Sequence, residues 1–412
     1  MKRIYFDYAA STPVDPAVLA AMRPYFSERF GNPGAVHRFG QEASAAVFSA
    51  RRRIAESLGA DYSNIIFTGS ATQANNLALR GVIKNWRHTL KAKSSKALPA
   101  GRQVKARIII SAFEHPSVLE TARDLKKSGV EIVIIPVNKD GFIDIKKIKA
   151  ALNERTVLVS VMYVNNEVGT IQPIAEIGKA ISEFRKQKVE SSSKNSRFYF
   201  LDSSFYPLFH TDAVQAFQYL PCNVDELGVD LMTLSAHKIY GPKGIGALYI
   251  RSAEMLAPVI TGGGQEQGLQ SGTENVPYIV GFGKAVEMVE KQRIAEFKRI
   301  IELQDYCWKQ LKKALPYVQL NGSLQHRTPN NLNVYLPGKP SYELMMALDL
   351  QGISVSPGEA CSARAIKPSD TLLAMGLGEQ RAFQSLRITF GRQTTKKEID
   401  ALVKKLKEVV ED

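Results

Sequence analysis

The sequence predicts an α/β protein with a mostly parallel central sheet in a large domain, followed by a smaller α+β domain. Two observations support this prediction. Between about residues 60 and 275, strand-length apolar runs alternate with stretches of helical spacing, the pattern of a parallel sheet covered by helices on both faces. From about residue 276 a long helical stretch leads into a region of mixed texture. The 412-residue length also fits two domains, because single cores stop growing near ~250–300 residues.

Six short apolar runs supply the predicted strands, with helical spacing between them at residues 117–129 and 174–186. We place the large domain at residues 16–275 and the small domain at residues 1–15 together with 276–412. Two low-complexity basic insertions, at about residues 88–105 and 187–207, interrupt the pattern. The strand runs are NIIFTG (64–69), RIIISA (107–112), EIVIIPV (131–137), TVLVSVMYV (156–164), FHTDA (209–213) and DLMTLS (230–235).

Most of the formal net charge of +14 lies in residues 84–107 and 185–197, which overlap these insertions and hold 13 Lys/Arg and one acidic residue, so the rest of the chain has a net charge of about +2. This distribution favours solvated surface segments, so direct nucleic-acid binding is not expected. If the protein did bind nucleic acid, its affinity would fall steeply with salt concentration. The N-terminus has no signal-peptide pattern, and no apolar run approaches the ~20 residues of a membrane helix. The three scattered cysteines suit neither a disulfide framework nor a metal site. We therefore expect a cytoplasmic protein with reduced thiols.

Polar side chains gather where the predicted strands end. The carboxyl ends of parallel strands meet at one edge of the sheet, where ligands bind. One strand leads into ATQANN, whose first residues can offer backbone N–H groups to an anion if a helix begins there. Each of these side chains alone could be structural, but together they would line one crevice. They are Ala71, Thr72, His115, Asn165, Asn166, Glu167, Asp212, Gln215, Ser235, His237 and Lys238.

Lys238 stands where a buried strand gives way to a tight turn. The run DLMTLS ends at Ser235, and Gly241, Pro242 and Gly244 exclude a regular helix directly after it. Desolvation at such a position lowers the pKa of a lysine, and a neutral lysine attacks carbonyl carbon. A solvated surface lysine is the plainer alternative for this residue.

One cofactor would explain the whole set. Pyridoxal 5'-phosphate requires a lysine for its aldehyde, a carboxylate for its pyridinium nitrogen and an anion site for its phosphate. Lys238, Asp212 and the helix start at Ala71 and Thr72 supply one each. Nucleoside phosphates and dinucleotides are disfavoured, because neither glycine-rich phosphate motif is present.

The motifs that contain these residues resemble the cysteine desulfurases of the NifS/IscS type, in the class V aminotransferase group. The resemblance covers nearly the whole chain apart from the two insertions. It is carried by Asp212-x-x-Gln215, by Ser235-x-His237-Lys238, by Gly262–Glu266 and by the segments Phe6–Pro16, Gly31–Gly40 and Ser385–Asp400.

This resemblance implies an aspartate aminotransferase-like fold of the pyridoxal-phosphate-dependent transferases. It implies conversion of L-cysteine to L-alanine, with the sulfur transferred to Cys361 as a persulfide for iron–sulfur cluster assembly or tRNA thiolation. A homodimer and a sulfur-acceptor protein would be the partners. Two alternatives remain. The protein could be a selenocysteine lyase or a related class V enzyme, or it could be a pyridoxal-binding interaction protein with weakened catalysis.

The resemblance also assigns roles to individual residues. Lys238 would bond to the cofactor aldehyde, Asp212 would pair with the pyridinium, and His115 would stack on the ring or move protons. The catalytic residues would be Cys361, Lys238 and His115. Asn166 and Gln215 would contact the ring oxygen. Arg387 and Asn32 would bind the substrate carboxylate, together with Asn166. The phosphate would be held by Ala71, Thr72, Ser235, His237 and, from the neighbouring subunit, Thr273.

Cys361 lies in SPGEACSARA, a Gly-, Ser- and Ala-rich stretch that favours a loop. Its loop context and the family's G-x-A-C-[ST] pattern favour a nucleophile, whereas Cys222 and Cys307 are predicted to be small buried hydrophobes. The sequence departs from the family at three positions. Gln267 and Gln270 stand where arginines are usual, and Glu359 stands where a serine is usual.

Overall fold

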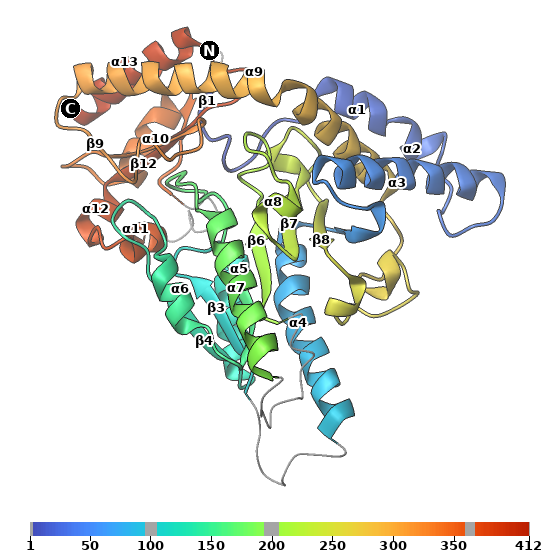
Figure 1. The fold of residues 1–412 in the computed structure, drawn as a ribbon. Helices are drawn as coiled ribbons and strands as arrows, with labels where there is room; N and C mark the ends of the chain where they lie inside the picture. Colours follow the sequence, from blue (N-terminus) through green and yellow to red (C-terminus); the bar gives the residue numbers. More distant parts are fainter. Residues whose placement is uncertain (1–2, 95–104, 193–205, 359–366, 412) are drawn as a thin grey trace.

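The computed structural model describes residues 3–94, 105–192, 206–358 and 367–411 and is built around one seven-stranded sheet (Figure 1). The six predicted strands are all present, and five of them run parallel as β7-β6-β5-β3-β4. The seventh strand, β8, was not predicted and is antiparallel to both of its neighbours, β7 and β2. The strands are β2 (Ile65–Thr68), β3 (Arg107–Ser111), β4 (Glu131–Ile135), β5 (Thr156–Ser160), β6 (Leu208–Asp212), β7 (Leu231–Ser235) and β8 (Gly246–Ile250).

Helices cover both faces of this sheet, as the alternation predicts (Figure 1). Alternate residues of each strand face opposite sides. In β2, Ile66 packs with α4 (Ala71–Ser94) and α5 (Pro116–Lys127). Its neighbours Ile65 and Phe67 pack in a second cluster with the helices of the other face. The long helices of that face are α3 (Arg38–Ser57), α7 (Ile174–Ser192) and the first half of α9 (Val276–Ala314). The same cluster includes residues of four shorter helices, α1 (Pro16–Met22), α2 (Pro24–Ser27), α6 (Ile145–Ala151) and α8 (Val224–Leu227).

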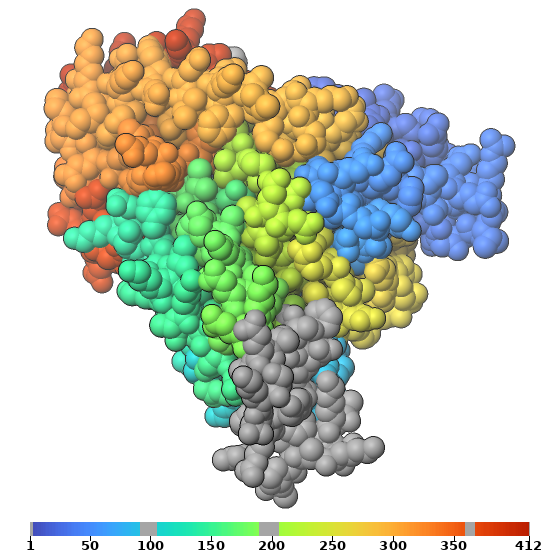
Figure 2. Space-filling view, viewed as in Figure 1, coloured from blue at the N-terminus to red at the C-terminus, as the bar shows by residue number. Residues whose placement is uncertain are grey.

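A third core lies under the C-terminal elements. It contains an antiparallel sheet ordered β12-β10-β9 and the pair β1 with β11, which joins the N-terminus to this region. Figure 2 shows these orange and red elements packed directly against the large sheet's teal and green elements. The elements are β1 (Ile4–Tyr5), β9 (Gln319–Leu320), β10 (Asn331–Tyr335), α10 (Ser341–Leu350), β11 (Ile353–Ser354), α11 (Asp370–Ala374), α12 (Glu379–Phe383), β12 (Ser385–Thr389) and α13 (Lys396–Glu411).

The long helix α9 belongs to two cores. Its residues up to Val289 pack with the large sheet, whereas Ile300 and later residues pack with the C-terminal elements. Leu372 and Ala382, from α11 and α12, also pack with the large-sheet cluster. The predicted boundary at residue 276 stays a prediction, since side chains from both sides of it share these cores. None of the helices in the described part of the chain is both long and apolar enough to span a membrane.

His210 lies in the middle of the large sheet and is fully buried. Its ring nitrogens hydrogen-bond the Ser160 hydroxyl at 2.8 Å and the Thr233 hydroxyl at 3.0 Å, so the ring links three adjacent strands. Burial lowers the pKa of His210 from 6.5 to about 4, although Asp212 opposes the shift. The folded protein therefore holds this ring neutral through most of the acidic range.

This burial predicts a pH-dependent contribution to stability. Below pH 6.5 the unfolded chain takes up a proton at residue 210, whereas the folded chain does so only near pH 4, so stability falls as the pH drops through this window. We expect the difference in unfolding free energy between wild type and His210→Asn to shrink by about 2 kcal/mol between pH 7 and pH 4.5. Denaturant unfolding at both pH values measures it, and a difference that stays constant would contradict the prediction.

Candidate active site

A cavity of about 210 Å³ lies at the carboxyl ends of β5, β6 and β7. The starts of α4 and α5, the N-terminal segment and β12 close it. Most of the predicted site residues line this cavity, although the sequence separates them by more than 300 positions. Those that do are Ala71, Thr72, His115, Asn166, Asp212, Gln215, Ser235, His237, Lys238 and Arg387.

Lys238 ends the single 3₁₀ turn that follows β7. Its amine donates hydrogen bonds to the carbonyl oxygens of Ala9 at 2.5 Å and Ala10 at 2.7 Å. The Ala9 carbonyl also accepts from the Gln215 amide at 2.9 Å. Ala9 and Ala10 are not among the predicted site residues, because they contribute main-chain oxygens and nothing in an alanine side chain signals that role. The N-terminal segment thus orients the amine toward the cavity.

Asp212, at the end of β6, has both carboxylate oxygens engaged. One accepts from the Asn75 amide at 2.8 Å and the other from the main-chain N–H of Val214 at 3.0 Å. Asn75 is fully buried and also donates to the Ser117 hydroxyl at 2.8 Å. Asn75 is not among the predicted site residues either, although an asparagine on an otherwise apolar helix face is a sequence signal for such a role. These two donors fix the orientation of the Asp212 carboxylate.

His115 caps the N-terminus of α5. Its Nδ1 accepts from the main-chain N–H of Ser117 at 3.1 Å, which leaves the proton of the neutral ring on Nε2. Burial and the charge of Lys238 lower the pKa of His115, while Asp212 opposes the shift. His115 is therefore neutral at pH 7.

The part of the cavity that is lined by the start of α4 is suited to an anion. Helix α4 begins at Ala71, and the first N–H groups of a helix have no acceptor within it. Gly246 of β8 lies so close that a Cβ there would come within 2.8 Å of the Ala71 nitrogen, and Gly246 pairs with Ser235. Close approach of the two backbones thus brings the helix start beside Ser235. Burial, with help from Lys238 and Lys243, lowers the pKa of His237 to about 4, so this ring is a neutral hydrogen-bonding group.

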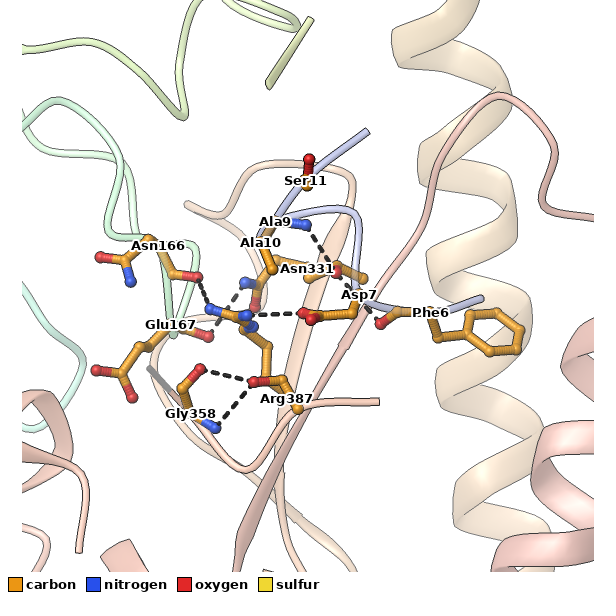
Figure 3. A network of polar contacts seen from close by, with 12 residues as sticks. Phe6, Asp7, Ala9, Ala10, Ser11, Asn166, Glu167, Asn331, Gly358 and Arg387 are labelled. Atoms are coloured by element: carbon orange, nitrogen blue, oxygen red, sulfur yellow. Dashed lines mark hydrogen bonds and ion pairs between the residues drawn. The ribbon is translucent and has the colours of Figure 1, made fainter. Parts of the chain in front are cut away.

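Arg387, on β12, brings a buried guanidinium to the cavity (Figure 3). Its side chain is only 2% exposed. One terminal nitrogen donates to the main-chain oxygen of Asn166 at 3.0 Å and the other to the carboxylate of Asp7 at 2.7 Å. The Nε atom has no hydrogen-bond partner among the described residues. The guanidinium is thus oriented by two acceptors and still has donors for a carboxylate.

Two predicted site residues do not reach the cavity of this chain. Asn32 is exposed and its side chain accepts from the N–H of Gly34 at 2.9 Å, which stabilises a local turn. Thr273 is also exposed, on a loop outside the cavity. Their roles stay predictions. Cys361 and Glu359 lie outside the described residues.

Cys222, Cys307, Gln267 and Gln270 lie outside the cavity lining. Cys222 and Cys307 are buried, as predicted, and burial raises the pKa of the Cys222 thiol to about 12. Gln267 donates to the Ser63 carbonyl at 2.6 Å, and neither it nor Gln270 lines the cavity. Within the described ranges no group of three His, Cys, Asp or Glu residues could hold a metal ion.

The donor set fits pyridoxal 5'-phosphate. One cavity is surrounded by an amine, by a carboxylate that accepts from two donors, and by the start of a helix. A hydroxyl group and a neutral imidazole lie beside this helix start. These are the groups required by the aldehyde, the pyridinium nitrogen and the phosphate of that cofactor. Lys238, Asp212 and the start of α4 would hold these three parts.

Comparisons with known proteins agree with this arrangement. The family model described as aminotransferase class V matches residues 4–189 and 206–402. The chain is 41% identical over 412 residues to the cysteine desulfurase IscS of Dictyoglomus turgidum, covering 100% of this chain and 95% of that protein. It is also 41% identical over 413 residues to the mitosomal cysteine desulfurase of Encephalitozoon cuniculi, covering 100% and 87%.

Solved structures give the same result. A NifS-like protein superposes with a TM-score of 0.85 at 32% identity and covers 99% of each chain. SspA in complex with cysteine superposes with a TM-score of 0.74 at 35% identity, covering 94% of this chain and 98% of that one.

The contact between Asn75 and Asp212 predicts a change in cofactor affinity. Asn75→Ala removes a hydrogen bond to a charged group, which contributes about 1.5–3 kcal/mol. We expect the Kd for pyridoxal 5'-phosphate to rise at least about tenfold, measured by absorbance during reconstitution of the apoprotein. Asn76→Ala is the matched control, because the Asn76 side chain bonds only within α4. An unchanged Kd in Asn75→Ala would show that Asp212 does not need this support.

Proposed function

The chain belongs to the aminotransferase class V family, and from that premise we propose that it is a cysteine desulfurase that converts L-cysteine to L-alanine and transfers the sulfur to Cys361. It uses pyridoxal 5'-phosphate, as the family does. The observation that supports the proposal best is that Lys238, Asp212, the start of α4 and Arg387 meet at one cavity.

The bound cofactor supplies an electron-accepting ring that allows the Cα atom of the substrate to lose a proton. Arg387 binds the substrate carboxylate through its remaining donors, and the contacts with Asp7 and Asn166 fix its orientation. Asp212 keeps the proton on the ring nitrogen. The amine of Lys238 moves the Cα proton, and the carbonyls of Ala9 and Ala10 hold that amine in place.

Cys361 then receives the sulfur. Its thiolate attacks the substrate sulfur, an S–S bond forms, the C–S bond of the substrate breaks, and a proton is delivered to the carbon that becomes the alanine methyl group. One L-cysteine and one thiol thus give one L-alanine and one persulfide. A sulfur-acceptor protein, for iron–sulfur cluster assembly or tRNA thiolation, removes the sulfur afterwards. We place this chemistry in the cytoplasm, because the described cysteines are unpaired thiols.

A second copy of the chain would complete the enzyme. The N-terminal helices form a projecting edge of the molecule, blue in Figure 2. Large apolar side chains are exposed there, with ring contacts between Phe30 and Phe39 and between Phe48 and Tyr62. Phe30 is 66% exposed and Val36 is 90% exposed, which is unusual for a surface that stays in water. We assign this edge to a homodimer interface, from which Thr273 would reach the partner's phosphate site.

The role of Cys361 is tested by Cys361→Ala. With pyridoxal 5'-phosphate and L-cysteine, wild type is expected to produce alanine and a protein persulfide. The variant should keep the absorbance of the bound cofactor and lose at least about 100-fold in the rate of alanine formation, because no thiol accepts the sulfur. Cys222→Ala should keep both products, since that thiol is buried. A persulfide formed at the wild-type rate in Cys361→Ala would overturn the assignment.

The homodimer is tested by Phe30→Asp. A charge at the centre of an apolar interface loses the burial that holds it together, so we expect the dimer Kd to rise at least about 100-fold. Light scattering across a dilution series measures it. Leu350→Asp is the control, because Leu350 is 89% exposed on α10, away from the N-terminal helices. Equal dissociation of both variants, or wild type that is already a monomer, would contradict the proposed interface.

A further inference from the structure

Glu167 is a buried carboxyl group next to the cavity that the mechanism above does not use. It follows Asn166 after β5 and is 0% exposed. Three asparagines fix its main chain: Asn165 accepts from its N–H at 2.9 Å, and Asn331 and Asn333 of β10 donate to its carbonyl at 3.1 and 3.2 Å. Its backbone is therefore rigidly held whatever its side chain does.

The side chain of Glu167 reaches the two residues that flank the segment containing Cys361. The Ser369 hydroxyl donates to its Oε2 at 2.6 Å. On the other flank, a Cβ built on Gly358 would lie 2.8 Å from the same oxygen. Gly358 has φ +138°, a conformation that L side chains rarely adopt, so both space and backbone require glycine there. One carboxylate oxygen thus accepts a hydrogen bond from one flank and leaves no room for a side chain on the other.

The same network continues to the substrate-carboxylate site (Figure 3). Arg387 donates to the carbonyl of Asn166, the residue before Glu167. The Arg387 backbone pairs with Ser356, and the Ser356 hydroxyl donates to the Gly358 carbonyl at 2.8 Å. Hydrogen bonds thus link Arg387 to Asn166 on one side and through Ser356 to Gly358 on the other, and the Glu167 carboxyl group lies close to Gly358.

We propose that Glu167 is a positioning residue for sulfur transfer, whose carboxyl group fixes Gly358 and Ser369 to the rigid turn that also orients Arg387. The inference rests on the proposed function, because it gives Glu167 a role only if Cys361 accepts the sulfur. Burial raises the pKa of Glu167, although Ser369 and Arg387 oppose the shift, which agrees with a carboxyl group that serves as a hydrogen-bonding anchor. The group touches neither substrate nor cofactor in this arrangement, since it is absent from the cavity lining.

The test separates substrate binding from sulfur transfer in the protein loaded with pyridoxal 5'-phosphate. The variants are Glu167→Ala, Ser369→Ala and the conservative Glu167→Gln, whose amide oxygen can still accept from Ser369. Titration of the cofactor absorbance with L-cysteine gives the Kd, and a single-turnover reaction gives the rate of persulfide formation. Glu120→Ala and Ser354→Ala, at exposed or partly exposed positions that are not part of the cavity lining, are the matched controls.

We expect Glu167→Ala and Ser369→Ala to lower the single-turnover rate at least about tenfold while the Kd for L-cysteine stays within about twofold, because the contact with Arg387 is made by the main chain. Glu167→Gln should keep at least half of the rate. The double variant Glu167→Ala/Ser369→Ala should be no slower than the slower single variant, since both changes remove the contact between Glu167 and Ser369, and the N-cap of α11 that Ser369 also provides is lost in Ser369→Ala and in the double variant alike.

Three outcomes would overturn the inference: a wild-type rate in Glu167→Ala, a Kd that rises in parallel with the loss of rate, or additive losses in the double variant. If Glu167→Ala does not fold, Ser369→Gly decides, because it removes the hydroxyl contact with Glu167 while glycine is tolerated at the N-cap of α11. If wild type forms no alanine, the proposed function itself is wrong. If wild type forms alanine and the variants do so at the same rate, only the role of Glu167 is wrong.

Discussion

A buried guanidinium needs hydrogen-bond acceptors in place of water, and Arg387 takes two of them from distant parts of the chain. Its acceptors come from Asp7 near the N-terminus and from Asn166 after β5. A single charged group therefore unites the N-terminal segment, the large sheet and β12. The N-terminal segment continues from Asp7 to the carbonyls that hold Lys238, so the same arrangement positions both the clamp and the amine.

The surface that lines the cavity around these groups is mainly apolar, and few of its side chains are charged. His115 and His237 are neutral at pH 7 because burial lowers the pKa of both. Behind His115, the buried carboxyl group of Glu114 accepts from the main-chain N–H of Met162 at 2.7 Å, and burial raises its pKa to about 8. The charges of Lys238, Asp212 and Arg387 thus act in surroundings of low polarisability, where each has a large effect on a bound anion or ring.

The sequence was sufficient to predict the elements and most of the cavity, because strand periodicity and polar strand exits are local signals. It did not reveal β8, a short strand whose sequence GALYI gives no alternation and whose place depends on the backbone approach at Gly246. It also missed Ala9, Ala10 and Asn75. The first two act through carbonyl groups, and Asn75 acts on Asp212 across 137 positions, so their roles exist only after folding.

The length of α9 has a consequence for how the protein comes apart. A continuous helix of 39 residues is a rod of ~58 Å, and it supplies side chains to the core of the large sheet at one end and to the C-terminal core at the other. If either half of α9 unfolds, the core to which that half belongs exposes its apolar side chains, and the end of the remaining half is no longer continued as a helix. The two regions are therefore coupled into one cooperative unit, and the C-terminal region is not an autonomous module that a protease or a genetic truncation could release intact.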